Sequence, residues 1–107
     1  MREYAKIKKE FDFLKREYGF EICGRQKRGS YFFITWTNSK VEIKVLYDLW
    51  EENPVSILIY DAASLGTIYD AVEYKEAFAL STGSPRQRIH GASEWLKKAI
   101  ADKIIMI

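Results

Sequence analysis

The chain has 107 residues, of which 48% are hydrophobic and 30% charged, and its formal net charge is +2. This composition predicts one folded domain over residues 1–107 and argues against a disordered chain. The single cysteine excludes an internal disulfide, and no apolar run is long enough to span a membrane. We therefore expect a cytoplasmic protein, and its nearly balanced charge provides no overall attraction to nucleic acid.

An amphipathic helix is predicted at the start of the chain. Its apolar positions follow spacings of three and four residues, at Tyr4, Ile7, Phe11, Leu14 and Tyr18. Gly19 follows the last of them directly, and a glycine at this place is typical of a helix C-terminal cap.

Four short runs rich in aromatic and β-branched residues predict β-strands, and these runs are residues 20–25, 30–37, 40–48 and 55–60. Residues 24–29 indicate a hairpin loop between two glycines, and Asn38-Ser39 indicates a two-residue turn. The third run alternates apolar with charged residues, which is typical of an antiparallel strand with one face in water. Its apolar positions are Val41, Ile43, Val45 and Tyr47.

A second amphipathic helix is predicted near the C-terminus, whereas residues 62–90 give little indication of their structure. The helix begins either near Gly91, where Ser93 could cap it, or as early as Ser84. Its apolar stripe consists of Ala92, Trp95, Leu96, Ala99, Ile100 and Ile104. We therefore expect an α+β fold, a two-layer sandwich in which a four-stranded antiparallel meander is flanked by an N-terminal and a C-terminal helix.

The second strand carries large apolar side chains at successive positions, from Tyr31 to Trp36. Because strand side chains alternate between faces, either Tyr31 and Phe33, or Phe32, Ile34 and Trp36, must point away from the helices. A later segment could bury that face, or the rings could form an exposed patch for a protein partner. For the second case we predict three aromatic anchors, at Phe32, Trp36 and Tyr60.

Basic side chains suggest an alternative function, which is the binding of single-stranded nucleic acid. Two clusters contribute, and their members are Arg25, Lys27, Arg28, Arg86 and Arg88. Cations beside aromatic residues can combine phosphate contacts with base stacking. The chain has no aromatic motif of the ribonucleoprotein type, and solvated loop charge explains the same residues.

The sequence contains no recognisable catalytic or metal-binding signature, so we predict no catalytic residue, metal or cofactor. His90 is the only histidine, and neither Cys23 nor any serine lies in a nucleophile motif such as Gly-x-Ser-x-Gly. A small enzyme of unrecognised type remains a third alternative.

The C-terminal residues Ile104-Ile-Met-Ile107 are unusually apolar for a chain end. Either they dock on the sheet or a second subunit covers them, and the second case makes a homodimer possible.

Two stretches resemble a group of small, mostly uncharacterised bacterial proteins in which a helix leads into a β-meander. These stretches are Phe11-Asp-Phe-Leu-Lys-Arg-Glu-Tyr-Gly-Phe20 and Val41-Glu-Ile-Lys-Val-Leu-Tyr-Asp48. Several such proteins are immunity proteins, which bind and block a toxin from a rival cell. The resemblance implies a bacterial protein of immunity type and no particular site residues. Our leading hypothesis is a non-enzymatic protein-binding module that holds its partner on the wet face or the edge strand of its sheet.

Overall fold

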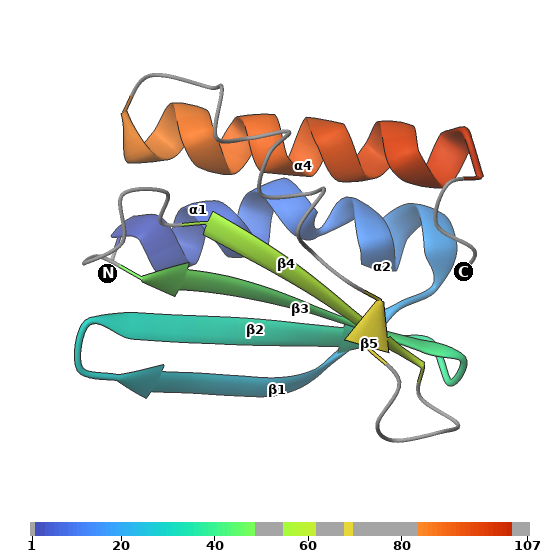
Figure 1. Cartoon of the computed structure of the whole chain (residues 1–107), viewed down its shortest axis with the longest axis horizontal. Coiled ribbons are helices and arrows are strands. Elements are labelled where there is room, and N and C mark those ends of the chain that lie inside the picture. The colour runs from blue at the N-terminus through green and yellow to red at the C-terminus, as the bar shows by residue number, and fades with distance from the viewer. Residues whose placement is uncertain (1, 49–54, 62–67, 70–83, 104–107) are drawn as a thin grey trace.

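The computed structural model describes residues 2–48, 55–61, 68–69 and 84–103, and Figure 1 shows helices on one face of a β-sheet. The helices are α1 (Arg2–Phe11), α2 (Phe13–Tyr18) and α4 (Pro85–Ala101). The strands are β1 (Glu21–Arg28), β2 (Tyr31–Thr37), β3 (Val41–Asp48), β4 (Val55–Asp61) and β5 (Ile68–Tyr69). Neighbouring strands follow the chain order from β1 to β5, and every pairing is antiparallel. The α+β fold with its antiparallel meander is therefore confirmed, with the short β5 as an additional strand.

The predicted N-terminal helix is interrupted at Asp12. The Asp12 backbone N–H donates to the Lys9 carbonyl, and the Lys15 N–H donates to the Asp12 carbonyl, so both bonds reach back three residues. A regular helix turns about 100° per residue, so it would not bring Phe13 and Leu14 equally into the core. The interruption buries both side chains, beside the predicted stripe residue Phe11.

The predicted cap at Gly19 is confirmed. Gly19 has φ 71°, its N–H donates to the Lys15 carbonyl, and the N–H of Phe20 donates to the Leu14 carbonyl. This left-handed backbone turns the chain from α2 into β1, and an L side chain adopts it only at a cost.

We therefore expect Gly19→Ala to lower the free energy of unfolding by about 1 kcal/mol. The cause is the backbone conformation alone, because no atom lies within 4 Å of the place where a Cβ would stand. Gly24→Ala is the matched control, since its Cβ would make only ordinary contacts with Thr35. Urea denaturation of the two variants measures the difference, and equal stability of Gly19→Ala and the wild type would contradict the assignment.

The prediction of a loop over residues 24–29 was wrong. β1 continues to Arg28, which pairs with Tyr31, so that Gly29 and Ser30 alone form the turn. Charged residues are tolerated here because β1 is an edge strand, whose side chains reach water. A β-bulge interrupts the pairing between Ile22 and Gly24, and from Gly24 to Arg28 the register is regular.

The core lies between the sheet and the helices. The alternating residues Val41, Ile43, Val45 and Tyr47 of β3 are buried, as predicted. Phe32 and Trp36 lie on the same face, with exposed fractions of 1% and 0%. The expectation that these two rings point away from the helices was therefore wrong.

Aromatic contacts explain why Phe32 and Trp36 face inward. The ring of Phe32 lies between two others, with centroids 5.6 Å from Tyr4 and 5.5 Å from Tyr47. The ring of Trp36 lies 5.9 Å from Phe11 of α1. Helix and sheet therefore share one aromatic core, which buries the largest apolar surfaces of β2.

α4 begins at the earlier of the two expected positions. The Ser84 hydroxyl accepts from the Gln87 N–H at 3.3 Å, and the Gln87 side-chain oxygen accepts from the Ser84 N–H at 2.8 Å. This reciprocal capping box makes Ser84 the cap, whereas Ser93 is buried inside the helix. α4 packs against α1 and β4.

Two expectations fall on residues outside the described ranges. They are the covering of the second sheet face by residues 62–90, apart from the parts in β5 and α4, and the docking or dimerisation of Ile104–Ile107. Among the helices described here, none is long and apolar enough to cross a membrane.

Candidate protein-binding surfaces

The face of the sheet that points away from the helices is more apolar than a fully solvated face. We call this surface the outer face, and its large apolar members are Tyr31, Phe33, Leu46, Leu58 and Tyr60. All five are partly exposed, and they alternate along β2, β3 and β4 with the buried core residues. Residues paired across antiparallel strands share a face, so Phe33 opposite Leu46 brings two of them together.

Lys44 occupies the middle of the outer face. Its Nζ lies 4.5 Å from the centroid of the Phe33 ring and 5.5 Å from that of Tyr60. Both distances permit a cation–π contact, which holds the lysine along the rings instead of extended into water. The outer face therefore presents one ordered positive charge within an apolar surface.

Only one of the three predicted anchors lies on this surface. Tyr60 belongs to the outer face, opposite Glu42 of β3. Phe32 and Trp36 belong to the core, so they offer no surface to a partner. Phe33 takes their place, and the strand alternation that placed Phe32 on one face already placed Phe33 on the other.

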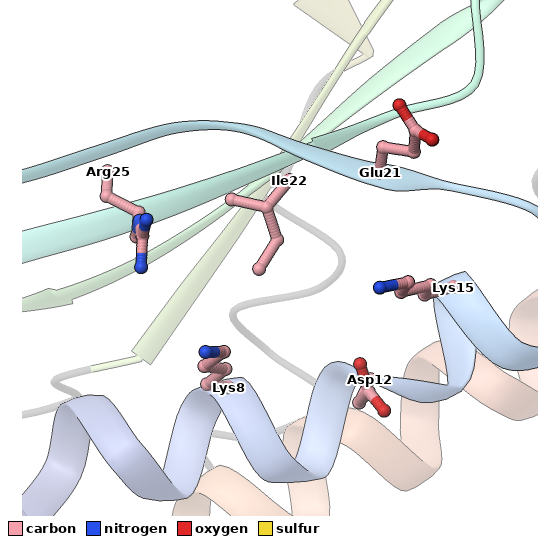
Figure 2. Close-up of a pocket in the computed structure, with 6 residues that line it drawn as sticks. All are labelled: Lys8, Asp12, Lys15, Glu21, Ile22 and Arg25. Atoms are coloured by element: carbon pink, nitrogen blue, oxygen red, sulfur yellow. The ribbon is translucent and has the colours of Figure 1, made fainter.

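A second candidate surface is a groove of about 350 Å³ between β1 and the helices α1 and α2. We call it the basic groove, and its lining residues are Lys8, Asp12, Lys15, Glu21, Ile22 and Arg25. Figure 2 shows Ile22 and Arg25 projecting from β1 toward α1, with Lys8 rising from that helix to meet them. A neighbouring hollow of about 350 Å³ shares Lys8 and Asp12 and continues along the outside of α1 and α2 to Lys9 and Arg16.

The two predicted basic clusters lie at different places. Arg25 and Lys27 pair with Ile34 and Phe32 and so face the helix layer, where the Arg25 guanidinium lies 3.4 Å from the Tyr4 hydroxyl. Arg86 and Arg88 lie in the first two turns of α4, which packs at the β4 side of the sheet. Arg28 is exposed at the end of β1, next to the hairpin turn. The structure therefore does not join the clusters into one surface.

A polar network connects α1 with α4. Glu10 is 14% exposed, and one of its oxygens lies 2.6 Å from the Lys6 ammonium. The other oxygen lies 3.0 Å from His90 Nδ1 and accepts from the Ser93 hydroxyl at 3.1 Å. Burial alone would raise the pKa of Glu10, but the hydrogen bonds from Lys6, His90 and Ser93 outweigh it and lower the pKa from 4.5 to about 2.

Serine, histidine and glutamate occur together in this network, yet their arrangement differs from a catalytic triad. A triad needs the serine hydroxyl on a histidine nitrogen. Here the Ser93 hydroxyl lies against Glu10 and the His90 backbone carbonyl, while His90 Nδ1 also points at Glu10. The network is suited to joining two helices.

Cys23 lies in the bulge of β1. Cys23 is exposed as a residue, yet partial desolvation of its sulfur raises the pKa of the thiol, and the nearby Glu42 carboxylate raises it further. A raised pKa lowers the thiolate fraction and with it the nucleophilicity of the sulfur. Within the described ranges, histidine, cysteine, aspartate and glutamate form no cluster of three or more that could hold a metal ion.

Comparison with protein-family models, curated proteins and solved structures found no match to this chain.

Proposed function

We propose that this chain is a non-enzymatic protein-binding module that holds its partner on the outer face of the sheet. The observation that carries the proposal is the group of partly exposed apolar side chains around Lys44, with Phe33 and Tyr60 at its centre. Large rings on an accessible surface are enriched in protein interfaces and dominate their binding energy. Lys44 adds a charge that would select a partner with a carboxylate or carbonyl group at the matching position.

The sharpest form of this proposal is an immunity-like role in the bacterial cytoplasm, where the partner is a toxin that the module blocks. The resemblance of residues 11–20 and 41–48 to small bacterial immunity-type proteins supports this form. It needs no catalytic group, and a rigid sheet with preformed rings lowers the entropic cost of binding.

Single-stranded nucleic acid is the less favoured ligand. Its binding needs cations and stacking rings on the same surface. Arg25 and Lys27 face the helix layer, whereas Phe33 and Tyr60 lie on the outer face. The outer face keeps Lys44 between the rings and Arg28 opposite Tyr31, but two of the predicted cations lie on the other side of the sheet, which favours a protein partner.

We expect Tyr60→Ala to weaken binding of the partner by about 30-fold, as for a typical interface hot spot. The melting temperature should change little, because the ring is partly exposed and lies on the outer face, away from the core. The measurement is capture of proteins from nuclease-treated host lysate by tagged wild type, Tyr60→Ala and the control Lys98→Ala on α4. A stoichiometric protein that wild type and Lys98→Ala retain and Tyr60→Ala loses is the expected result. Equal capture by all three would contradict binding through the outer face.

A further inference from the structure

The strand β1 is an open edge of the sheet. It pairs with β2 on one side, and the strand order places no described strand on its other side. An edge strand presents a row of backbone N–H and C=O groups, which is a template for an additional strand. The bulge limits this template to one part of β1, the five residues from Gly24 to Arg28 that keep regular pairing.

An added strand paired with Gly24 to Arg28 would lie beside Arg25, at the Lys8 end of the basic groove. Neighbouring strands are about 4.8 Å apart, and their side chains alternate between the two faces of the sheet. Arg25 and Ile22 of β1 already point into the groove on the helix side (Figure 2). Every second side chain of the new strand would therefore face the helix layer, next to Arg25 and Lys8.

The charge of this space decides which strand it fits. The groove is lined by three cationic side chains, Lys8, Lys15 and Arg25, against the two carboxylates Asp12 and Glu21, and Figure 2 shows Glu21 projecting to the other side of β1. Asp12 also lies 3.7 Å from Arg16, which offsets its charge, so the space that a new strand would enter is positive. An acidic segment is complementary to such a surface, and a basic one is repelled.

The lining residues also favour a peptide over a nucleic acid. Among the residues that the structure describes, neither the groove nor the neighbouring hollow is lined by an aromatic ring that could stack on a base, and Ile22 is the apolar side chain of the groove. Base stacking contributes much of the affinity of single-strand binders. Backbone pairing with β1 is available to a peptide alone.

We propose that an extended acidic segment of a partner protein adds to β1 as a further strand and places alternate carboxylates in the basic groove. The inference rests on the proposed protein-binding function, but it uses a surface distinct from the outer face. It specifies the sequence pattern of the segment, with acidic residues at every second position, on the side that faces Lys8 and Arg25. The same basic side chains would repel a second copy of this chain at that edge, which keeps the strand available.

The test is a titration of the ¹⁵N-labelled protein with an eight-residue peptide in which glutamate alternates with threonine, matching the length of β1. We expect shifts of the amide signals from Gly24 to Arg28, slower exchange of their outward amides, and an affinity that falls as salt rises. A peptide with lysine in place of glutamate should not bind. The same glutamate peptide N-methylated at alternate residues should bind at least about tenfold more weakly, because it keeps the charge and loses the backbone donors.

Variants of the chain identify the surface. Lys8→Glu combined with Arg25→Glu should weaken peptide binding at least about tenfold, whereas the exposed Lys98→Glu on α4 should leave it unchanged. Melting temperatures confirm that each variant is folded. If the double variant folds and still binds the peptide as the wild type does, the inference is overturned.

Three other results would overturn it. They are no binding of the glutamate peptide at millimolar concentration, equal binding of its N-methylated form, and tighter binding of oligo-dT to the same residues. If Tyr60→Ala loses the captured partner but the glutamate peptide does not bind, this inference alone is wrong. If the peptide binds at β1 while Tyr60→Ala captures the partner as well as the wild type, the inference stands and the proposed use of the outer face is wrong.

Discussion

Replacing Trp36 with alanine is expected to lower the free energy of unfolding by about 3–5 kcal/mol. The side chain is fully buried, contacts Phe11 of α1, and pairs with Ile22 and Ile43 on the neighbouring strands. Its loss would leave a cavity at the junction of both layers. A chain of this size is stabilised by roughly 5–15 kcal/mol in total. Urea denaturation should therefore show that Trp36→Ala is only marginally stable.

Two further variants distinguish the effect of a core substitution from that of a surface substitution. Tyr60→Ala should change stability by less than about 1 kcal/mol, because that ring lies on the outer face. Trp36→Phe should be much milder than Trp36→Ala, because it keeps most of the ring and removes an indole N–H that has no hydrogen-bond partner in the described part of the chain. A Trp36→Ala variant as stable as Tyr60→Ala would contradict the placement of Trp36 in the core.

The sequence contained enough information to place Trp36 correctly. The expected two-residue turn at Asn38-Ser39 would pair Trp36 with Val41, and the observed register pairs it with Ile43. Both partners belong to the apolar set of β3, so either register puts Trp36 on the inner face. Both faces of β2 are apolar, so β2 alone does not show which face is buried, and only the alternation of β3 across the turn decides it.

The extent of β1 was harder to predict. The run Arg25-Gln-Lys-Arg28 has the composition of a loop, and it forms a strand because β2 provides a complete partner from Tyr31 to Thr35. Tertiary pairing thus overrides local propensity, as is common for edge strands. The basic groove depends on this strand and on the interruption at Asp12, so no local pattern could indicate it.

The outer face was predictable in part. The alternation of β3 placed Lys44 on it and that of β2 offered Phe33, but their cation–π contact requires the register between the strands. The contact of Glu10 with His90 joins residues 80 positions apart in the sequence. A lone histidine and an ordinary helical glutamate carry no local signal for such a contact.

We expect the protein to lose stability in acid, because protonation of Glu10 removes its contacts with Lys6, His90 and Ser93. In the folded chain the pKa of Glu10 is about 2, because the hydrogen bonds from Lys6, His90 and Ser93 outweigh the opposing effect of burial. In the unfolded chain the pKa of Glu10 is that of an ordinary glutamate, near 4.5. Folding therefore favours the ionised form, so the stabilisation is complete above about pH 4.5 and is lost as the pH falls toward 2.

The difference between the two pKa values corresponds to about 3 kcal/mol. Glu10→Gln should lose up to this amount at pH 7, and its unfolding free energy should depend much less on pH between 4.5 and 2 than that of the wild type. Glu17→Gln is the control, because Glu17 is exposed on the neighbouring helix α2 and should keep the wild-type profile. Urea denaturation at several pH values measures all three chains. Parallel profiles for Glu10→Gln and the wild type would show that acid acts through other groups, whereas a flattened profile would identify the junction of α1 and α4 as the acid-sensitive part of the fold.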